Sequence, residues 1–566
     1  MERSDPQQVT NRQVAGVLTF MGQLLEISGD DPFKIRPYYR AAQEVERQSE
    51  PVAGRGEEEL VALRGIGRQI ARKIGEIEET GTFRELDELR AEIPDSLIEL
   101  LALDSVGPKT INLLWKKLGI LSVGDLDKAA RNHRIRAVKG FGAKKEENIL
   151  RAIDRFQQKN GRMTRAEADA IVNAATGVLL PGTFTVAGSY RRGLSTVGDI
   201  DIVTLEERDA VRPRLTAVAD EVIDDGSRKT SLRIGGRRVD IRYATPEIYG
   251  AMLMYLTGSK AFNIRIRAVA NSGGYTLNEY GLEERSSGRL QTFADEEGLF
   301  RELKMDYVPP ELREDRGEVE LALAGALPSL VDLPDVRGDL HSHTRWSDGR
   351  QTLEEIAVRG DELGYEYILI TDHSSSLGVA RGLDTDALQR QQSEIEHTNR
   401  RHTCTLLSGV EVDIKSDGAL GLPGKMLADL DLVIASVHSG FQQEEDQITR
   451  RILSAVENEH VDIVGHPTGR LLGRRPPYAV DLARVIERAA EVGTALEINA
   501  SPHRLDLDDI YIRQAKEKGV KLTIGTDSHR TSEFSNMRYG ITLARRGWCT
   551  APDILNTSTL AGLLEW

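Results

Sequence analysis

The chain has 566 residues, enough for three or four domains with buried cores, and its hydrophobic content of 40% is ordinary for a soluble protein. No apolar run approaches the ~18 residues of a membrane span, and the first residues lack the basic and apolar regions of a signal peptide. The two cysteines, Cys404 and Cys549, are too few for a disulfide framework. We therefore expect a cytoplasmic protein without a membrane partner. The net charge of -15 at first sight argues against nucleic-acid binding. Residues 131–165, however, hold 11 Lys or Arg against 3 acids, and phosphates respond to the local charge rather than to the net charge.

A glycine turn between two short helices recurs three times in the first 160 residues, in LRGIGRQIARKI, LDSVGPKTINLL and VKGFGAKKEENIL. Such a turn lets the next helix offer its unpaired N–H groups to a phosphate oxygen. The repeats resemble helix-hairpin-helix elements, which bind the DNA backbone without reading its sequence. The second copy has Ser105 in place of its first glycine. The candidate DNA-binding glycines are Gly65, Gly67, Gly107, Gly140 and Gly142.

The run TFTVAGSYRRGLSTVGDIDIVTL predicts a strand, a glycine turn, a short helix and a second strand with Asp199 and Asp201. Residues two apart on a strand face the same side, so both carboxylates point to one place. A third acid, Asp240, lies in the strand-like run RRVDIRYA, which could pair beside that strand. Three convergent carboxylates can hold two Mg2+ ions roughly 4 Å apart. In GSYRRG, Ser189 and Arg192 can bind phosphate at a helix start.

These motifs resemble the nucleotidyltransferase core of family X DNA polymerases, the DNA polymerase beta-like family, over residues 10–310. The resemblance implies that the three acids are catalytic and bind Mg2+, and that Ser189 and Arg192 hold the triphosphate of an incoming deoxynucleotide. It also implies a nucleotide pocket in YLTGSKAFNIRIRA. The matching positions are Tyr255, Gly258, Asn263 and Arg267.

Two positions of this segment depart from the beta-like relatives. Leu256 stands where those relatives have an aromatic residue beside the sugar, so the discrimination between ribo- and deoxyribonucleotides is open. Lys260 adds a cation near the phosphates or the DNA.

The N-terminal region resembles the small lyase domain of the same family. The match places Lys73 at the lysine that forms a Schiff base with a 5'-deoxyribose phosphate, while Gln69 occupies the position of a partner basic residue. A lysine that is merely solvated is an equal alternative. Tyr38 and Arg40 match DNA-contacting positions.

From Asp339 to the end, short apolar runs stop at a His, Asp or Glu, as in GDLHSH, ILITDH, LLSGVE, VIASVH, DIVGHP and TIGTDSH. With ALEINA, in which Asn499 stands where the other runs have an ionisable group, they predict about seven strands alternating with helices, whose carboxyl ends meet on one face. Asn499 is expected to contact a ligand residue or the substrate. Histidines and carboxylates without cysteine suit Zn2+ or Mn2+, and so many suggest two or three ions. The candidate ligands are His341, His343, Asp348, His373, Glu411, His438, His466, Asp527 and His529.

These segments resemble the polymerase and histidinol phosphatase (PHP) domain, and all nine ligand positions of its motifs are filled. The resemblance implies metal-dependent cleavage of phosphoesters. The alternative is a metal site that only stabilises the fold.

We therefore predict a multidomain chain with helical helix-hairpin-helix domains, an α+β nucleotidyltransferase palm and a distorted (β/α)7 barrel. The predicted domains are a lyase-like domain at 1–85, a helix-hairpin-helix DNA-binding domain at 86–162, the palm at 163–244, a nucleotide-pocket subdomain at 245–316, a linker at 317–336 and the PHP domain at 337–566.

The predicted function is a DNA-directed DNA polymerase that fills short gaps in DNA repair, with a 3'-5' exonuclease in the PHP domain. The expected partners are gapped or primed double-stranded DNA and deoxynucleoside triphosphates. Abasic-site endonuclease, 3'-phosphatase and 5'-deoxyribose-phosphate lyase are further candidate activities. Two alternatives remain open: a polymerase with a purely structural PHP domain, and a non-catalytic scaffold that binds DNA ends.

Overall fold

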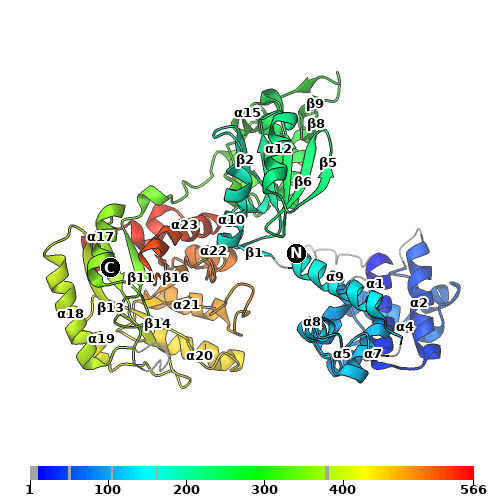
Figure 1. Cartoon of the computed structure of the whole chain (residues 1–566), viewed down its shortest axis with the longest axis horizontal. Helices are drawn as coiled ribbons and strands as arrows, with labels where there is room; N and C mark the ends of the chain where they lie inside the picture. The colour runs from blue at the N-terminus through cyan, green and yellow to red at the C-terminus, as the bar shows by residue number, and fades with distance from the viewer. Residues whose placement is uncertain (1–10, 49–51, 104–105, 139, 161, 376–381) are drawn as a thin grey trace. The chain divides into compact units, whose positions relative to one another are not determined.

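The computed structural model describes residues 11–48, 52–103, 106–138, 140–160, 162–375 and 382–566 (Figure 1). The chain divides into two compact units, Met1–Gly161 and Arg162–Trp566. No helix in this described part of the chain is long and apolar enough to cross a membrane.

The first unit is built from helices around one apolar core, in which Leu18 and Ile74 are fully buried. Each predicted glycine turn leads into a helix: Gly67 and Gly107 cap α4 and α7, and Gly142 directly precedes α9. Ser105 lies outside the described residues. The helices are α1 (Asn11–Ser28), α2 (Pro32–Arg47), α3 (Glu57–Val61), α4 (Arg68–Thr80), α5 (Arg84–Glu92), α6 (Asp95–Ile98), α7 (Pro108–Leu118), α8 (Val123–Arg131) and α9 (Ala143–Asn160).

The second unit begins with a five-stranded mixed sheet in the order β2-β4-β7-β6-β5. Strands β4 and β7 pair in parallel, which sets Asp201 opposite Asp240, and the other neighbours are antiparallel. Helices α10 (Arg165–Thr176) and α12 (Arg208–Val218) pack on its apolar side chains. The strands are β2 (Phe184–Val186), β4 (Ile200–Thr204), β5 (Glu221–Asp225), β6 (Lys229–Ile234) and β7 (Arg237–Tyr243), and the short pair β1 (Met163–Thr164) and β3 (Thr196–Val197) lies beside it.

A smaller subdomain follows, with its own core around Phe262 and Phe300. Its elements are α13 (Tyr249–Thr257), α14 (Lys260–Ser272), the antiparallel strands β8 (Tyr275–Asn278), β9 (Gly281–Glu284) and β10 (Leu290–Gln291), and α15 (Glu296–Glu302). Helix α16 (Glu318–Ala324) lies in the segment predicted as a linker.

The C-terminal part is a barrel of seven parallel strands that are hydrogen-bonded in chain order. A bridge between Ser342 and Ser528 joins the first strand to the chain just after the last, so the sheet is nearly closed. The strands are β11 (Gly338–Ser342), β12 (Tyr367–Ile370), β13 (Thr405–Asp413), β14 (Leu432–Ser436), β15 (Ile463–Val464), β16 (Ala495–Asn499) and β17 (Leu522–Gly525).

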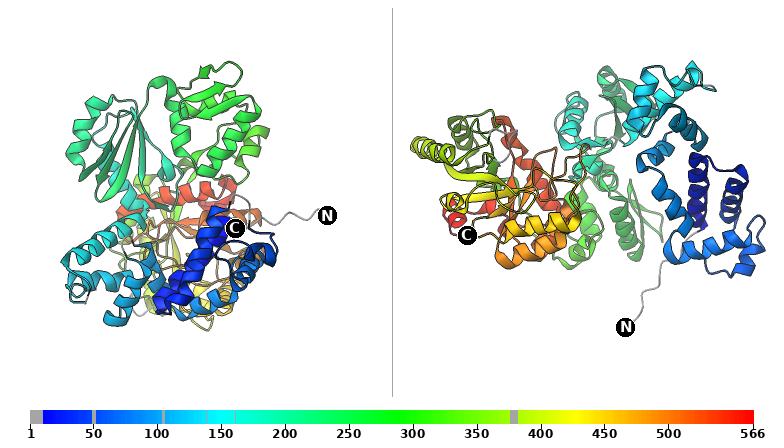
Figure 2. Two further views of the ribbon diagram at one scale, coloured as in Figure 1. Left: turned by 90° about the vertical axis from the view of Figure 1, so that its right-hand side faces the viewer. Right: turned by 90° about the horizontal axis from the view of Figure 1, so that it is seen from below.

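Amphipathic helices cover the barrel strands, and the right-hand panel of Figure 2 shows α20 beside α21. The barrel helices are α17 (Leu353–Leu363), α18 (Thr385–Asn399), α19 (Gly424–Leu427), α20 (Glu445–Val456), α21 (Leu482–Val492), α22 (Asp509–Glu517), α23 (Met537–Arg546) and α24 (Leu560–Leu564). The predicted fold class is confirmed: a helical first region, a mixed middle and a seven-stranded parallel barrel.

Candidate active sites

Glu411 lies at the centre of a histidine cluster at the carboxyl ends of the barrel strands. Its carboxylate oxygens lie 3.0 Å from His466 Nε2, 3.0 Å from His373 Nδ1 and 3.2 Å from His438 Nε2, and the side chain is only 1% exposed. Burial opposes ionisation of Glu411, but the surrounding His438, His373 and His341 hold its pKa well below its usual range. A buried carboxylate held ionised among imidazoles is a strong ligand for a divalent cation.

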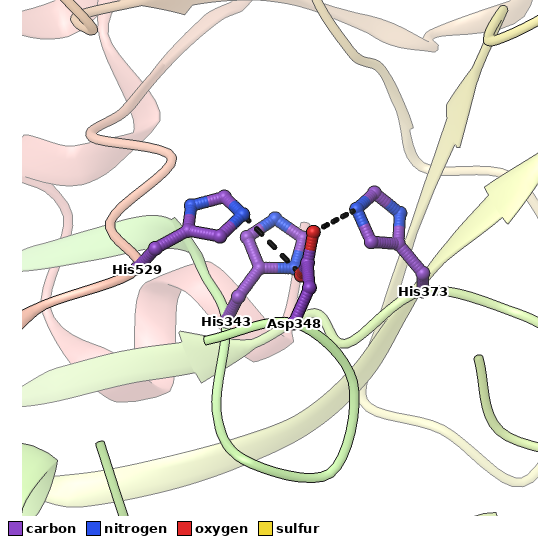
Figure 3. Close-up of side chains that lie close together, drawn as sticks. All are labelled: His343, Asp348, His373 and His529. Carbon is purple, nitrogen blue, oxygen red and sulfur yellow. Dashed lines mark ion pairs between the residues drawn. The ribbon is translucent and has the colours of Figure 1, made fainter. Parts of the chain in front are cut away.

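The remaining predicted ligands meet where the barrel closes. Asp527, after β17, has its Oδ1 3.2 Å from His343 Nε2 and 3.9 Å from His341 Nε2, both on or directly after β11. Figure 3 shows Asp348 between His529 and His373, at 3.3 Å and 3.6 Å from their Nε2 atoms. The structure therefore brings all nine predicted ligand residues into one site.

Three groups within this site have ligand atoms that all lie within 4.8 Å of one another. His343 and His373 each belong to two of the groups, as expected for neighbouring ions. The groups are His343, Asp348, His373 and His529; His341, His343 and Asp527; and His373, Glu411 and His438.

The donors fit divalent metal ions. The Nδ1 atoms of His343 and His466 are buried and have no hydrogen-bond partner among the residues that the structure describes. Burial, together with the neighbouring His529 and His373, lowers the pKa of His343 to about 4. His343 is therefore neutral at pH 7, which is the form that binds metal.

Sequence reasoning missed the carboxylates that orient these ligands. Glu497 Oε1 lies 2.6 Å from His341 Nδ1, and Asp413 Oδ1 lies 2.7 Å from His438 Nδ1. Asn499 was predicted to contact ligand or substrate, and its Nδ2 donates to Asp527 Oδ2 at 3.2 Å. Partners of this kind fix the direction of a ligand ring and raise its affinity for metal.

A signal for both missed acids is present in the sequence. Glu497 precedes Asn499 by two residues on β16, and Asp413 follows Glu411 by two on β13, so each shares a strand face with a predicted site residue. Arg504, whose Nε lies 3.2 Å from Asp527 Oδ2, was also missed. It lies in a loop, where side chains do not follow the two-residue alternation of a strand.

The three palm acids form a second site. Asp201 and Asp240 are direct partners across β4 and β7, and Asp199 directly precedes β4. Burial, together with the charges of Asp199 and Asp240, raises the pKa of Asp201 to about 7. Lys229 Nζ lies 2.8 Å from Asp240 Oδ2, and Arg238 Nε lies 3.1 Å from its Oδ1. Carboxylates that repel one another in this way favour a bound cation.

The GSYRRG turn begins directly beside these acids. Gly188 starts the short helix α11 (Gly188–Arg191) with a φ of +62°, and a Cβ there would lie 2.5 Å from Asp201 Oδ2, so a side chain does not fit. Ser189 is the second residue of α11. Arg192, predicted to bind triphosphate, donates from Nε to Glu314 Oε1 at 3.0 Å and from Nη1 to the carbonyl of Thr257.

The predicted pocket residues lie next to this arginine. A Cβ at Gly258 would lie 3.2 Å from Arg192 Nη1. On α14, Asn263 Nδ2 donates to the carbonyl of Tyr255 at 2.7 Å, and the Arg267 guanidinium lies 5.8 Å from the centre of the Tyr255 ring. The structure therefore gathers the predicted nucleotide-binding residues at the junction of the palm and the α13–α14 subdomain.

Lys73 lies in the first unit, where its side chain is 9% exposed and forms an ion pair with Glu85. Its Nζ also lies 4.7 Å from the centre of the Phe83 ring and 6.0 Å from that of Tyr38. Gln69 and Lys73 line one cavity of the first unit, together with Tyr38 and Glu85. Because a carboxylate already neutralises Lys73, the lyase role stays a prediction. Arg40, by contrast, is exposed, and a Cβ at Gly65 would lie 3.8 Å from its Cβ.

Glycine-turn helices, a palm with three acids and a barrel with a histidine-rich centre together define the family X DNA polymerases that carry a C-terminal PHP domain, and the chain belongs to this family. Four segments of the chain match known families, and their descriptions agree with this assignment. The matched descriptions are a helix-hairpin-helix domain (9–83), a SAM-like helix-hairpin-helix tandem (97–155), the DNA polymerase beta thumb (252–314) and the PHP domain (339–501).

Among its relatives is the DNA polymerase/3'-5' exonuclease PolX of Bacillus subtilis (strain 168), 36% identical over 97% of this chain and 98% of that protein. A probable phosphatase of Thermoanaerobacter sp. (strain X514) is 31% identical over 39% of this chain and 89% of its own length. DNA polymerase lambda of Rattus norvegicus is 25% identical over 54% of this chain and 56% of its own length.

Proposed function

We propose that the chain is a DNA-directed DNA polymerase with a 3'-5' exonuclease in its PHP domain, and that it fills short gaps during DNA repair. The observation that carries the proposal is that one chain gathers three palm carboxylates in one place and all nine residues predicted as barrel ligands in another. The substrates would be gapped or primed double-stranded DNA and deoxynucleoside triphosphates.

In the palm, Asp199, Asp201 and Asp240 would hold Mg2+. When bound, these ions neutralise phosphate charge and favour loss of the proton of the primer 3'-hydroxyl. The chain's own residues would hold the nucleotide for in-line attack on its α-phosphate. Ser189 and the N–H groups that begin α11 bind the triphosphate, together with the donors of Arg192 that its protein contacts leave free.

In the barrel, the nine ligands would hold two or three Mn2+ or Zn2+ ions, which supply a water nucleophile at neutral pH and neutralise the phosphodiester. Glu497 and Asp413 keep two of the ligand imidazoles in place. Arg504 lies at Asp527, with a guanidinium that can also bind a phosphate oxygen of the 3'-terminal nucleotide.

The test uses a labelled primer on one-nucleotide-gapped DNA with Mn2+, with and without deoxynucleotides. We expect extension with nucleotides and shortening without them. Asp199→Asn should abolish extension and spare shortening, and His341→Gln should do the reverse. Extension without shortening in the wild-type protein favours a structural barrel, and neither reaction favours a DNA-end scaffold. Equal loss of both reactions in either variant contradicts the assignment of two sites.

A further inference from the structure

Helix α23 of the PHP domain packs directly on the GSYRRG turn of the palm. Gly193, the last residue of that turn, is buried with a φ of +75°. A Cβ at Gly193 would overlap Thr542 Cγ2 and would lie 3.4 Å from Arg546 Cδ, both on α23. The turn predicted to bind triphosphate therefore contacts α23 directly.

Arg546, at the end of α23, holds this contact together. Its side chain is only 5% exposed. Its Nη1 donates to the backbone carbonyl of Arg192 at 2.7 Å and to Glu314 Oε1 at 3.1 Å. Its Nη2 donates to Asp509 Oδ2, on α22, at 2.7 Å. One buried guanidinium thus joins the barrel to the palm turn and to Glu314, near the end of the nucleotide-pocket subdomain.

The same Glu314 oxygen accepts a hydrogen bond from Arg192 Nε. Arg546 therefore reaches Arg192 twice, directly at its backbone and through Glu314 at its side chain. A guanidinium has five N–H donors. Nε and one hydrogen of Nη1 are used by Glu314 and Thr257, so both hydrogens of Nη2 and one of Nη1 are available for a phosphate. These contacts fix the plane in which those donors lie.

A second set of contacts holds the turn from its other side. Tyr190 donates from its hydroxyl to Asp169 Oδ1, on α10, at 2.7 Å. The other oxygen of Asp169 accepts from Arg538 Nη2 at 2.6 Å and from the Tyr539 hydroxyl at 2.5 Å, both on α23. The turn is thus held by the same PHP helix on both sides of Arg191.

We infer that Arg546 is a positioning residue of the polymerase site, which acts through Glu314 to orient the Arg192 guanidinium toward the nucleotide triphosphate. This inference rests on the proposed polymerase function. It gives the PHP domain a role in nucleotide binding that requires none of its metal ligands, because α23 lies beyond the last of them, His529. Such pre-orientation lowers the entropic cost of binding the nucleotide.

The test is steady-state single-nucleotide insertion by the full chain carrying Arg546→Met. Met removes the donors and keeps an apolar stem, while Asp509 keeps Arg316 at 2.8 Å and Glu314 keeps Arg192, so no acid is left without a cation. We expect KM for the deoxynucleotide to rise about tenfold or more, the range for a lost hydrogen bond to a charged group, with kcat changing less. Arg546→Lys should recover part of the loss.

The matched control is Arg545→Met on the same helix, since Arg545 contacts Glu311 and the carbonyl of Val331 and none of the residues around Arg192. It should leave KM within twofold. Shortening of the primer without nucleotides should stay within twofold of the wild type in both variants, because that reaction does not use Arg192.

A double-mutant cycle with Glu314→Gln distinguishes an effect of Arg546 that passes through Glu314 from an unrelated disturbance of the structure. If Arg546 acts through Glu314, the two losses are not additive, and the double variant resembles the worse single variant. Unchanged KM in Arg546→Met, equal loss of extension and shortening, or additive losses overturns the inference. A wild-type protein that does not extend a primer instead contradicts the proposed function itself, so the two failures are distinguishable.

Discussion

Replacing Glu296 by Gln should destabilise the joint between the palm turn and α15. Glu296 is almost fully buried and accepts hydrogen bonds from Arg191, at 2.7 and 2.9 Å, and from Arg313 at 2.6 Å. Burial alone would raise the pKa of Glu296, but these two cations outweigh it and hold the pKa at about 2, against an ordinary 4.5. That difference corresponds to about 3 kcal/mol of stabilisation.

The sign of the pH dependence follows from the lowered pKa. The stabilisation by Glu296 is fully present above pH 4.5, and it is lost as the pH falls toward 2, because the folded protein must then bind a proton that the unfolded chain binds more readily. Glu296→Gln also leaves Arg191 and the fully buried Arg313 without a counter-charge, which typically costs about 3–5 kcal/mol.

Urea unfolding followed by circular dichroism at pH 7, 5, 4 and 3 would measure how much the free energy of unfolding differs between the wild type and Glu296→Gln. We expect about 3 kcal/mol or more at pH 7, and a steadily smaller difference below pH 4.5. Glu320→Gln is the control, since Glu320 pairs with Arg265 at the surface and should contribute less than about 1 kcal/mol. A difference that is independent of pH, or under 1 kcal/mol at pH 7, refutes the reasoning.

Three further predictions concern the two sites. Glu411→Gln should abolish shortening and lower the metal content measured by elemental analysis, with extension retained, because the Glu411 carboxylate contacts His373, His438 and His466; full metal content would contradict this. Glu497→Gln should weaken metal binding about 10- to 100-fold, seen as a shifted Mn2+ titration of shortening, since it orients His341; an unshifted titration would count against that role. Gly188→Ala should remove extension and spare shortening, because its methyl group would displace Asp201; normal extension by this variant would be inconsistent with the palm geometry.

Much of the barrel could be predicted because most of the candidate ligands lie at the end of a short apolar run or just after it; Asp348, in the loop after β11, is the exception. A buried parallel strand needs such a run, and its carboxyl end places the next polar residue on the common face. In the palm, the two-residue period of a strand predicted that Asp199 and Asp201 face the same side, and that the strand with Asp240 could pair beside them. The structure pairs those strands and adds the register, with Asp201 opposite Asp240. The assigned roles of these residues remain predictions that the proposed experiments test.

The contacts that orient the site residues could not be predicted in this way. Arg192 and Glu314 are 122 residues apart, and no local pattern indicates that they meet. Arg546 reaches Arg192 over 354 residues, from another domain. Side chains on a helix that face a neighbouring domain look like ordinary surface charges in a sequence. Lys73 and Glu85, by contrast, lie only 12 residues apart within the first unit, but on two different helices, and no periodic pattern indicates that they meet.

The closure of the barrel has a consequence for how the enzyme is made. Asp339, on the first strand, accepts hydrogen bonds from Thr526 after the last strand, 187 residues later in the sequence. At about 5–20 residues per second, a ribosome needs roughly 10–40 s to synthesise that distance. The site that contains His341 and His343 therefore cannot form until Asp527 has been synthesised. During that interval the palm is already synthesised, so a nascent chain acquires its proposed degradative centre last.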